Sequence, residues 1–536
     1  MRLVKSDPRV DFREVVSLST QPTWLEQLGL WYLPFLAGVA LTFSVTPDDA
    51  LITLRYAANF VHGHGLVYNS GQHVQGFTSY LGLFVAIIVY LSPGALVLLK
   101  MKIASLIFGL LAIHEAGQLL YGLEIPRWSM RTGIFTAATC AIVAFASGNG
   151  LETSLEMWLL IAVARRLVVP RSLESSFVIG AFAVAAVLAR PDALAPLTVM
   201  AVCGLLLELS QPLARRVAWF AGAIGAGVVT VIFNVFYFNS LLPNTYYAKS
   251  LPVSEALTLG YQYIQHLLQP EASTQFNLVF ILQVLFFSVG AFSSFRHHRR
   301  SIYLLALIVG QTLFVLKSGG DWMIGKRFLA AAAIPFIVIE VLGITLVASS
   351  IGRRLKQSVK RTPQMMVGML LVFTSLAPFS VARAPAWSLS GLDDRSLIAS
   401  GAPSAFSVLS AGVPSTLKCL KPGQLVATSE IGYLGFARLD LRILDVRGLT
   451  NRAIAMSAPS SLKTTVGVDD TNWYEASSPV GKVLLAEKPA VIAELDSLPQ
   501  SYVLGGRYRL VKETVKRGVT LGFYVPRNSR GICQST

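Results

Sequence analysis

Two adjacent carboxylates, Asp48 and Asp49, open the stretch of this sequence that is richest in groups able to do chemistry. The stretch covers residues 47–80 and reads PDDALITLRYAANFVHGHGLVYNSGQHVQGFTSY. The further candidates in this stretch are Arg55, Tyr56, Asn59, His62, His64, Asn69 and Gln75. Polar, glycine-rich chain between hydrophobic segments is costly at membrane depth unless it lines a cavity or lies at the interface, so we interpret this stretch as a functional site. A simpler alternative is that the two aspartates cap a helix that follows Pro47.

Four further polar motifs interrupt the hydrophobic sequence: SGNGLETS (147–154), RPDA (190–193), LPNTYYAK (242–249) and GGDWMIGKR (319–327). They add the candidates Glu152, Arg190, Asp192, Asn244, Tyr246, Tyr247, Lys249, Asp321, Lys326 and Arg327. A carboxylate can take the proton of an acceptor hydroxyl, while fixed cations can bind a phosphate and stabilise charge that develops on it. This combination indicates group transfer from a phosphate-linked donor. An ion pathway is less favoured, because it would place ionisable residues in the middle of several spans.

Structural roles remain open for several of these residues. Arg190 can pair with Asp192, Glu152 can cap a helix, and Asp321 can pair with a neighbouring cation, while His62 and His64 read as loop residues. Two histidines with one spacer make a weak metal signal. A divalent cation on the paired aspartates is possible, since hard cations take carboxylates, but the chemistry requires no cofactor and no metal site is predicted.

The composition places most of the chain in lipid. Of its 536 residues, 53% are hydrophobic and 14% are charged, whereas a soluble domain carries roughly 25% charged residues. The net charge of +16 does not indicate a nucleic-acid partner, because the basic residues gather in a few short loops. The polar first 27 residues, with no cleavage site after the first apolar run, argue against a cleavable signal peptide.

The positions of the basic residues predict the topology. Four of them precede the first apolar run, so we expect a cytoplasmic N-terminus. Residues 79–92 hold about 13 apolar residues, too few to cross a bilayer, and are expected to form an in-plane or half-inserted helix. Without this helix, the sequence predicts eleven spans, at 28–46, 96–121, 132–147, 153–168, 174–189, 193–210, 217–238, 276–295, 301–317, 327–349 and 364–381. With this count the later basic clusters fall inside and all five polar motifs fall outside.

Three parts make up the predicted chain: a cytoplasmic segment (1–27), a transmembrane module (28–384) with its first outer loop at 47–80, and an extracytoplasmic α+β domain (385–536). The fold class is therefore a polytopic α-helical membrane protein with a C-terminal soluble domain. A segment within 250–275 is predicted to form an amphipathic helix along the outer surface. In the last part, QLVATSEIGYLGF, LRILDVRGL and 519–525 read as strands and 478–496 as helical.

Two of the four cysteines belong to the C-terminal part. Cys140 and Cys203 lie in apolar spans, where a thiol behaves as a small hydrophobe. A bridge between Cys419 and Cys533 would close a loop of more than 100 residues, worth about 4–5 kcal/mol in the chain-entropy model. We predict this disulfide, because the topology puts the domain in an oxidising compartment.

The segment DDALITLRYAANFVHGHGLVYNSGQHVQGFTS resembles the first outer loop of the GT-C superfamily of polyprenyl-phosphate-dependent glycosyltransferases. It is most similar to the terminal arabinofuranosyltransferases of mycobacterial cell-wall arabinan and their bacterial relatives. GLETS, RPDA, LPNTYYAK, GGDWM…RF and IGYLGF…ILDVRGLTN follow the same pattern, so the resemblance covers most of the chain. The first-loop motif is specific for the group and much less specific for the sugar.

The resemblance implies juxtamembrane helices in the first outer loop and a C-terminal periplasmic domain. It implies direct displacement at the anomeric carbon, with inversion, and an acidic base that corresponds here to Asp48 or Asp49, with Asp49 slightly favoured. The expected ligands of the donor phosphate are Arg55, Arg190, Lys249 and Arg327. The expected ligands of the sugar or acceptor are Tyr56, Asn69, Gln75, Glu152, Asp192, Asn244, Tyr247 and Asp321.

We therefore expect a monomeric cell-membrane enzyme of envelope biogenesis, in the inner membrane if the cell is Gram-negative. Its partners would be a polyprenyl-phosphate sugar, membrane lipid, and a glycan, glycolipid or glycoprotein acceptor. Arabinofuranose is the favoured sugar, and transfer of mannose or another hexose is a close alternative. A flippase or transporter for lipid-linked sugars is an alternative of another class, and it would move its substrate without cleaving a bond.

Overall fold

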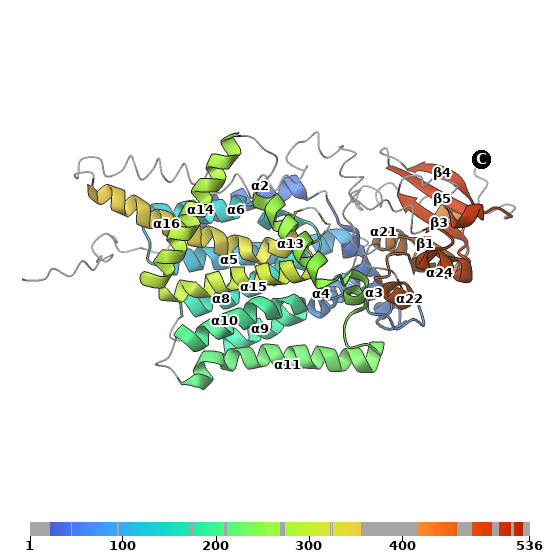
Figure 1. Cartoon of the computed structure of the whole chain (residues 1–536), viewed down its shortest axis with the longest axis horizontal. Coiled ribbons are helices and arrows are strands. Elements are labelled where there is room, and N and C mark those ends of the chain that lie inside the picture. Colours follow the sequence, from blue (N-terminus) through green and yellow to red (C-terminus); the bar gives the residue numbers. More distant parts are fainter. Residues whose placement is uncertain are drawn as a thin grey trace, which may run out of the picture.

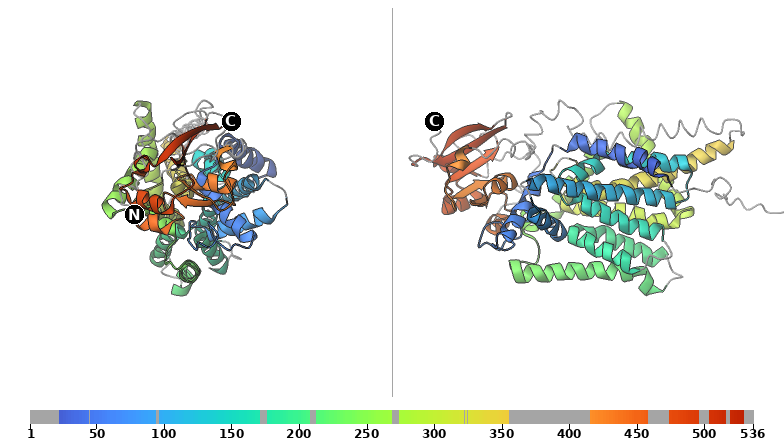
Figure 2. Two further views of the ribbon diagram at one scale, coloured as in Figure 1. Left: turned by 90° about the vertical axis from the view of Figure 1, so that its right-hand side faces the viewer. Right: turned by 180° about the vertical axis from the view of Figure 1, so that it is seen from behind.

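A computed structural model describes residues 22–354 and 415–528, apart from 44, 94–95, 171–175, 208–211, 269–273, 322, 324, 458–473, 496–502 and 516–518. Its long helices lie side by side along the longest axis of the molecule, and a small β-sheet domain lies beyond one end of them (Figure 1). The view from behind shows the same arrangement, with short helices between the two parts (Figure 2).

The helices of the bundle begin and end close to the predicted spans. Their bounds are α1 (Trp24–Gln27), the π-helix η2 (Leu28–Tyr32), α2 (Leu33–Thr42), α5 (Val97–Gly122), α6 (Arg127–Thr139), α7 (Ala141–Gly148), α8 (Thr153–Val168), α9 (Ser176–Ala189), α10 (Leu194–Leu207), α11 (Leu213–Phe238), α14 (Thr274–Arg296), α15 (Ile302–Ser318) and α16 (Ala330–Arg354). Small and branched apolar side chains of these helices form one large buried core, so the bundle is packed throughout its interior.

Four of the described helices are long and apolar enough to cross a membrane: Val97–Gly122, Arg216–Phe238, Arg299–Ser318 and Arg327–Ser350. A fifth is added if α6 and α7 count as one span, and these two helices are bent by 46° at Cys140, whose backbone is extended. The predicted span at 132–147 therefore corresponds to parts of two helices with a bend between them. The total of eleven spans stays a prediction, and its last member, 364–381, lies outside the described residues.

Short helices occupy the loops at one end of the bundle. They are α3 (Asp48–Val61), α4 (Tyr80–Leu91), α12 (Asn244–Lys249), α13 (Val253–Leu268) and the 3₁₀ turns η3 (Pro191–Ala193) and η5 (Arg327–Leu329); η4 (Arg299–Ser301) is a further 3₁₀ turn before α15. Helix α4 has 12 residues and begins where the Ser79 hydroxyl accepts a hydrogen bond from the Gly82 amide. The predicted short helix at 79–92 and the predicted helix within 250–275 are confirmed as helices.

The C-terminal domain contains a five-stranded mixed sheet in the order β2-β1-β3-β5-β4. The strands are β1 (Leu425–Thr428), β2 (Arg442–Asp445), β3 (Val491–Leu495), β4 (Tyr508–Val515) and β5 (Val519–Pro526), and the helices are α20 (Ser415–Lys418), α21 (Ile431–Ala437), α22 (Arg452–Ser457) and α24 (Pro479–Glu487). Strand β1 is parallel to β2 and β3, while β5 is antiparallel to β3 and β4. This confirms a small C-terminal sheet domain of mixed α and β structure.

Two sequence expectations for this domain are wrong. The strand predicted across QLVATSEIGYLGF ends at Thr428, and IGYLGF forms helix α21. The helix predicted at 478–496 ends at Glu487, and β3 follows it. The two misassigned pieces, IGYLGF (431–436) and VIAEL (491–495), are too short for periodicity alone to separate a buried strand from a short buried helix.

A second hydrophobic core joins the first loop to the C-terminal domain. It contains Leu51, Tyr56 and Tyr68 of the loop together with Ile431 and Phe523 of the domain, all nearly inaccessible to solvent. The domain is therefore packed on α3. The packing between the domain and the first loop therefore influences the orientation of the polar side chains in that loop.

Candidate active site

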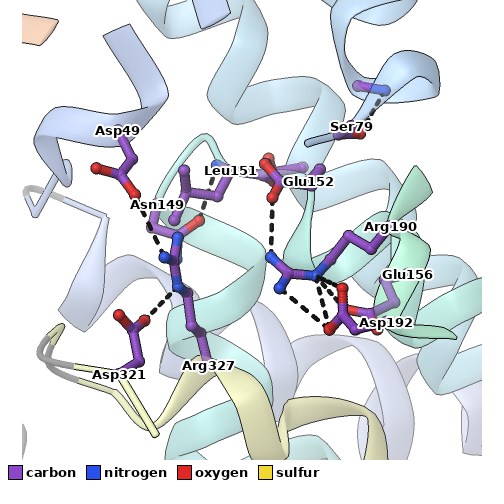
Figure 3. A network of polar contacts seen from close by, with 12 residues as sticks. Asp49, Ser79, Asn149, Leu151, Glu152, Glu156, Arg190, Asp192, Asp321 and Arg327 are labelled. Carbon is purple, nitrogen blue, oxygen red and sulfur yellow. Dashed lines mark hydrogen bonds and ion pairs between the residues drawn. The ribbon is translucent and has the colours of Figure 1, made fainter. Parts of the chain in front are cut away.

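Figure 3 shows a cluster of charged side chains. They belong to α3 and to the ends of several helices of the bundle. The members of the cluster come from four of the predicted polar motifs: Asp49, Glu152, Arg190, Asp192, Asp321 and Arg327. Asp49 belongs to the first turn of α3, and the others stand at the ends of α8, α9, α15 and α16. Four of the five predicted polar segments thus contribute to this cluster, although they are distant in the sequence.

Arg327 connects the first loop to the loop between α15 and α16. Its Nη2 donates to Asp49 Oδ2 at 3.2 Å, and its Nε donates to Asp321. The guanidinium is almost completely buried, whereas the Asp49 carboxyl is 20% exposed. The preceding loop contains Gly319, Gly320 and Gly325 with positive φ angles, which let the chain turn tightly from α15 into η5. Asp49 is therefore the partly accessible member of this pair.

Arg190 is surrounded by carboxylates. It pairs with Glu152 at 3.0 Å, Glu156 at 3.1 Å and Asp192 at 3.0 Å. Its backbone is extended because proline follows it, and this places the side chain beside the first turn of α8. Glu156 was missed by the sequence reasoning, although it follows Glu152 by four residues, the spacing that puts two helical side chains on one face.

The electrostatics of the cluster favour an ionised Asp49. Burial alone would raise the pKa of this carboxyl, but the charges of Lys249, Arg327 and Arg190 outweigh burial and hold its pKa below the usual range. Lys249 is exposed at the end of α12 and is the strongest of these three influences. At neutral pH, Asp49 is therefore a carboxylate that can accept a proton.

Asp48 faces away from this cluster, toward the C-terminal domain. Its two carboxylate oxygens accept hydrogen bonds from the backbone amides of Gly432 at 2.7 Å and Tyr433 at 2.5 Å, in the first turn of α21. Burial raises the pKa of Asp48 to about 7, even though the two amides act in the opposite direction. The adjacent aspartates thus have different partners and different environments.

Three other predicted ligands also hold the C-terminal domain. Arg55 donates to the carbonyl oxygens of Gly435 and of Leu441, the latter at 2.7 Å. Asn69 exchanges two hydrogen bonds with the backbone of Ile443 in β2, at 2.8 and 3.0 Å. Asn244 donates to Gly448 O at 2.6 Å. The structure does not bring these residues to the charged cluster.

The remaining predicted residues lie around the first loop. The Tyr56 hydroxyl donates to Val74 O at 2.5 Å and accepts from the Gly76 amide at 2.8 Å, and Gln75 Nε2 donates to the Tyr80 hydroxyl at 3.1 Å. Tyr247 is half-buried on α12, with the Arg452 guanidinium 5.9 Å from its ring centre. Tyr56 and Gln75 therefore shape the loop next to the cluster rather than the cluster itself.

Within the described ranges, no three His, Cys, Asp or Glu side chains are grouped so that they could hold a metal ion. Cys419 is disulfide-bonded, and its predicted partner, Cys533, lies outside the described residues. Cys140 and Cys203 are free thiols.

The comparisons with known proteins agree with the fold. The chain is similar to ArnT from Cupriavidus metallidurans bound to undecaprenyl phosphate, with a TM-score of 0.52, 13% identity, and coverage of 94% of this chain and 97% of that one. The apo state of the same protein matches with a TM-score of 0.51, 12% identity, and coverage of 92% and 96%. The archaeal oligosaccharyltransferase AglB from Archaeoglobus fulgidus matches at 0.49 and 11% identity, over 94% of this chain and 75% of that one. The chain therefore shares the fold of ArnT.

Sequence comparisons cover less of the chain. A protein-family model described as a domain of unknown function, DUF8728, matches residues 415–527, which is the C-terminal sheet domain. No curated protein matches the sequence.

Proposed function

We propose that this chain is a GT-C-type membrane glycosyltransferase that moves a sugar from a polyprenyl phosphate to a hydroxyl group of an acceptor. The observation that carries this proposal is the Asp49–Arg327 pair, in which a partly accessible carboxylate is held ionised beside buried and exposed cations. The fold shared with ArnT, which was solved with undecaprenyl phosphate, supports a lipid phosphate as the carrier. The apolar spans agree with a membrane-embedded site.

In the proposed reaction, Asp49 takes the proton of an acceptor hydroxyl as its oxygen attacks the anomeric carbon of the donor sugar. The new glycosidic bond forms as the bond between that carbon and the phosphate oxygen breaks, so the configuration inverts. The polyprenyl phosphate leaves with the bonding electron pair and gains negative charge. Cations beside the leaving oxygen stabilise this charge in the transition state.

The contacts divide the predicted cations into two groups. Arg327 contacts Asp49 directly, and Lys249, which is exposed, has the strongest effect of the three cations that lower the pKa of Asp49; this supports these two as ligands of a donor phosphate. Arg190 already balances three carboxylates, and Arg55 is committed to backbone carbonyls. We therefore assign phosphate binding to Lys249 and Arg327, and structural roles to the other two arginines.

The proposed sugar is arabinofuranose, because the first-loop segment is most similar to the arabinofuranosyltransferases. Transfer of mannose or another hexose would use the same base and the same cations. The acceptor would be a glycan, a glycolipid or a glycoprotein outside the cell membrane.

A transfer assay tests the proposal. Membranes that contain the protein are incubated with labelled polyprenyl-phosphate arabinofuranose and, in parallel, with labelled polyprenyl-phosphate mannose, and the label transferred to an acceptor is measured. The expected result is label in an acceptor that depends on an intact Asp49, with Asp49→Asn as the matched control. A flippase would instead move the lipid-linked sugar across the bilayer without cleavage and would tolerate Asp49→Asn. Label that stays on the lipid with both donors would overturn the proposal.

A further inference from the structure

A hollow of about 460 Å³ lies where the first loop, the end of α11, α12 and the C-terminal domain meet. This volume falls in the range of about 300–1,000 Å³ that is usual for small-molecule sites. Its lining includes His73 and Gln75 from the first loop, Phe238 and Asn239 from the end of α11, Asn244 from α12 and Arg452 from α22. It is distinct from the charged cluster around Asp49, with which it shares no residue.

The walls of the hollow are fixed by hydrogen bonds between its parts. The Asn244 amide donates to Gln75 O at 2.9 Å, and its side chain donates to Gly448 O at 2.6 Å. Arg452 Nη1 donates to Asn239 O at 3.0 Å, so the C-terminal domain also holds the end of α11. The hollow is therefore built by docking of the domain and forms a preorganised site.

The lining has the chemistry of a site for a polyhydroxylated ligand. Three of its side chains are amides, a group that can hydrogen-bond sugar hydroxyls. The side-chain nitrogens of Gln75 and Asn244 already donate, to Tyr80 and to Gly448 and Leu449, so these two residues would meet a sugar through their amide oxygens. Gln75 is 1% exposed, and its Oε1 has no hydrogen-bond partner among the described residues. The His73 ring packs edge-on against Tyr237 at 4.8 Å, which adds an aromatic surface beside the amides.

The charges of the hollow differ from those of the cluster. Its lining contains no carboxylate, and Arg452 is its fixed cation. A neutral or anionic ligand is therefore favoured over a cationic one. The cluster, in contrast, combines five carboxylates with two arginines and the nearby Lys249, which suits proton transfer and phosphate release.

One helix connects the two places. Asp49 stands in the first turn of α3, and Tyr56, two turns later, holds Val74 O and the Gly76 amide on either side of Gln75. The wall of the hollow is thus fixed to the helix that carries the proposed base.

Resting on the proposed function, we infer that this hollow is a subsite for the acceptor glycan, in which one or two sugar residues bind through Gln75, Asn239 and Asn244. It holds the acceptor chain, while the hydroxyl that reacts reaches Asp49. The acceptor class is therefore a saccharide chain, neutral or anionic, rather than a phospholipid or a protein.

Photo-crosslinking in native membranes tests this inference. The photoreactive amino acid p-benzoylphenylalanine replaces His73, which lines the hollow, or Phe236, which is 86% exposed on α11 and serves as the matched control. After irradiation of the full-length protein, mass spectrometry of its peptides reports what is attached. We expect saccharide adducts at position 73 several-fold above those at position 236, both with Asp49 intact and with Asp49→Asn, because binding does not need the base.

A second variant separates recognition from mere proximity. Asn239 has a φ of +50°, so Asn239→Gly removes the amide without straining the backbone. We expect this change to lower the saccharide adduct at position 73 and to raise the acceptor KM while kcat changes little, as for lost uniform binding. Adducts that carry phospholipid or polyprenyl phosphate, equal saccharide labelling at both positions, or insensitivity to Asn239→Gly would each overturn the subsite. Since adducts form without transfer, failure here is distinct from failure of the proposed reaction.

Discussion

Asp48 and Arg55, seven residues apart on α3, hold opposite ends of helix α21 in the C-terminal domain. Asp48 accepts hydrogen bonds from two backbone amides in the first turn of α21. Arg55 donates to the carbonyl of Gly435 in the last turn of α21 and to that of Leu441 beyond it. Each charge complements the dipole at its end of the helix. Because successive helical residues point about 100° apart, Asp49 faces the charged cluster while Asp48 faces the domain. One helix therefore serves both docking and the proposed catalysis.

The first prediction separates the two aspartates. We expect Asp49→Asn to lower the rate of sugar transfer by about 10²–10⁴-fold, the loss typical of a missing general base. We expect Asp48→Asn to retain the chemistry but to loosen the docked domain, because an amide is a weaker acceptor for the Gly432 and Tyr433 amides. Transfer in purified membranes and thermal unfolding in detergent measure the two effects.

A reversed pattern would contradict this assignment. If Asp48→Asn abolished transfer in protein that unfolds at the normal temperature, Asp48 would be the base. If both variants transferred sugar at nearly the normal rate, the first-loop carboxylates would have no part in the reaction.

The second prediction concerns the pH dependence of transfer. Cations hold the pKa of Asp49 below its ordinary value, so Asp49 stays ionised at pH values that protonate an ordinary aspartate. The acid limb of kcat/KM should therefore lie below the ordinary titration range of an aspartate, provided that the protein stays folded there. The pKa of Asp48 is raised to about 7, so a base at that position would give an acid limb near neutrality. A limb near pH 7 that disappears in Asp48→Asn would refute Asp49 as the base.

The sequence shows which polar motifs converge but not how their side chains divide between tasks. Asp49, Arg190 and Arg327 could be identified as candidate site residues from the sequence, because each lies in a polar segment at the end of an apolar run. The docking roles of Asp48 and Arg55 could not, since their partners lie about 380 residues further along the chain and are backbone groups of α21 and the turn after it. A backbone partner leaves no side-chain pattern for sequence reasoning to detect.

The helix α21 illustrates the same limit in the fold. IGYLGF is apolar throughout and reads as a strand, but its two glycines let it pack as a helix directly on α3. A Cβ atom at Gly432 would meet the backbone of Asp48, and one at Gly435 would meet the Tyr68 hydroxyl. Close packing with a distant segment, rather than local propensity, therefore decides the structure here.

The third prediction concerns docking of the C-terminal domain. Arg55→Met keeps the apolar stem but leaves buried carbonyls of α21 and Leu441 without donors, at about 1–3 kcal/mol for each unsatisfied group. We expect a lower unfolding temperature and faster limited proteolysis near residues 438–441. Arg442→Met is the matched control, because Arg442 is exposed on β2. Equal protease resistance of the two variants would show that Arg55 does not hold the domain.

The last prediction separates the two buried arginines of the cluster. Arg190→Met would leave Glu152, Glu156 and Asp192 buried without their cation, and breaking a buried pair in this way typically costs about 3–5 kcal/mol. We expect its main effect to be a low yield of folded protein. Arg327→Lys keeps a positive charge between Asp49 and Asp321 but loses the planar guanidinium, which pairs with these two carboxylates through Nη2 and Nε and which we propose also meets the donor phosphate.

We therefore expect Arg327→Lys to fold with nearly normal stability and to transfer sugar slowly, with a raised KM for the polyprenyl-phosphate donor. Gel filtration in detergent reports the folded fraction, and initial rates at varied donor concentration report KM and kcat. Arg190→Lys is the matched control for retained charge, and it should recover much of the yield that Arg190→Met loses. If Arg190→Met folded well and lost transfer, while Arg327→Lys transferred normally, the roles assigned to the two arginines would have to be exchanged.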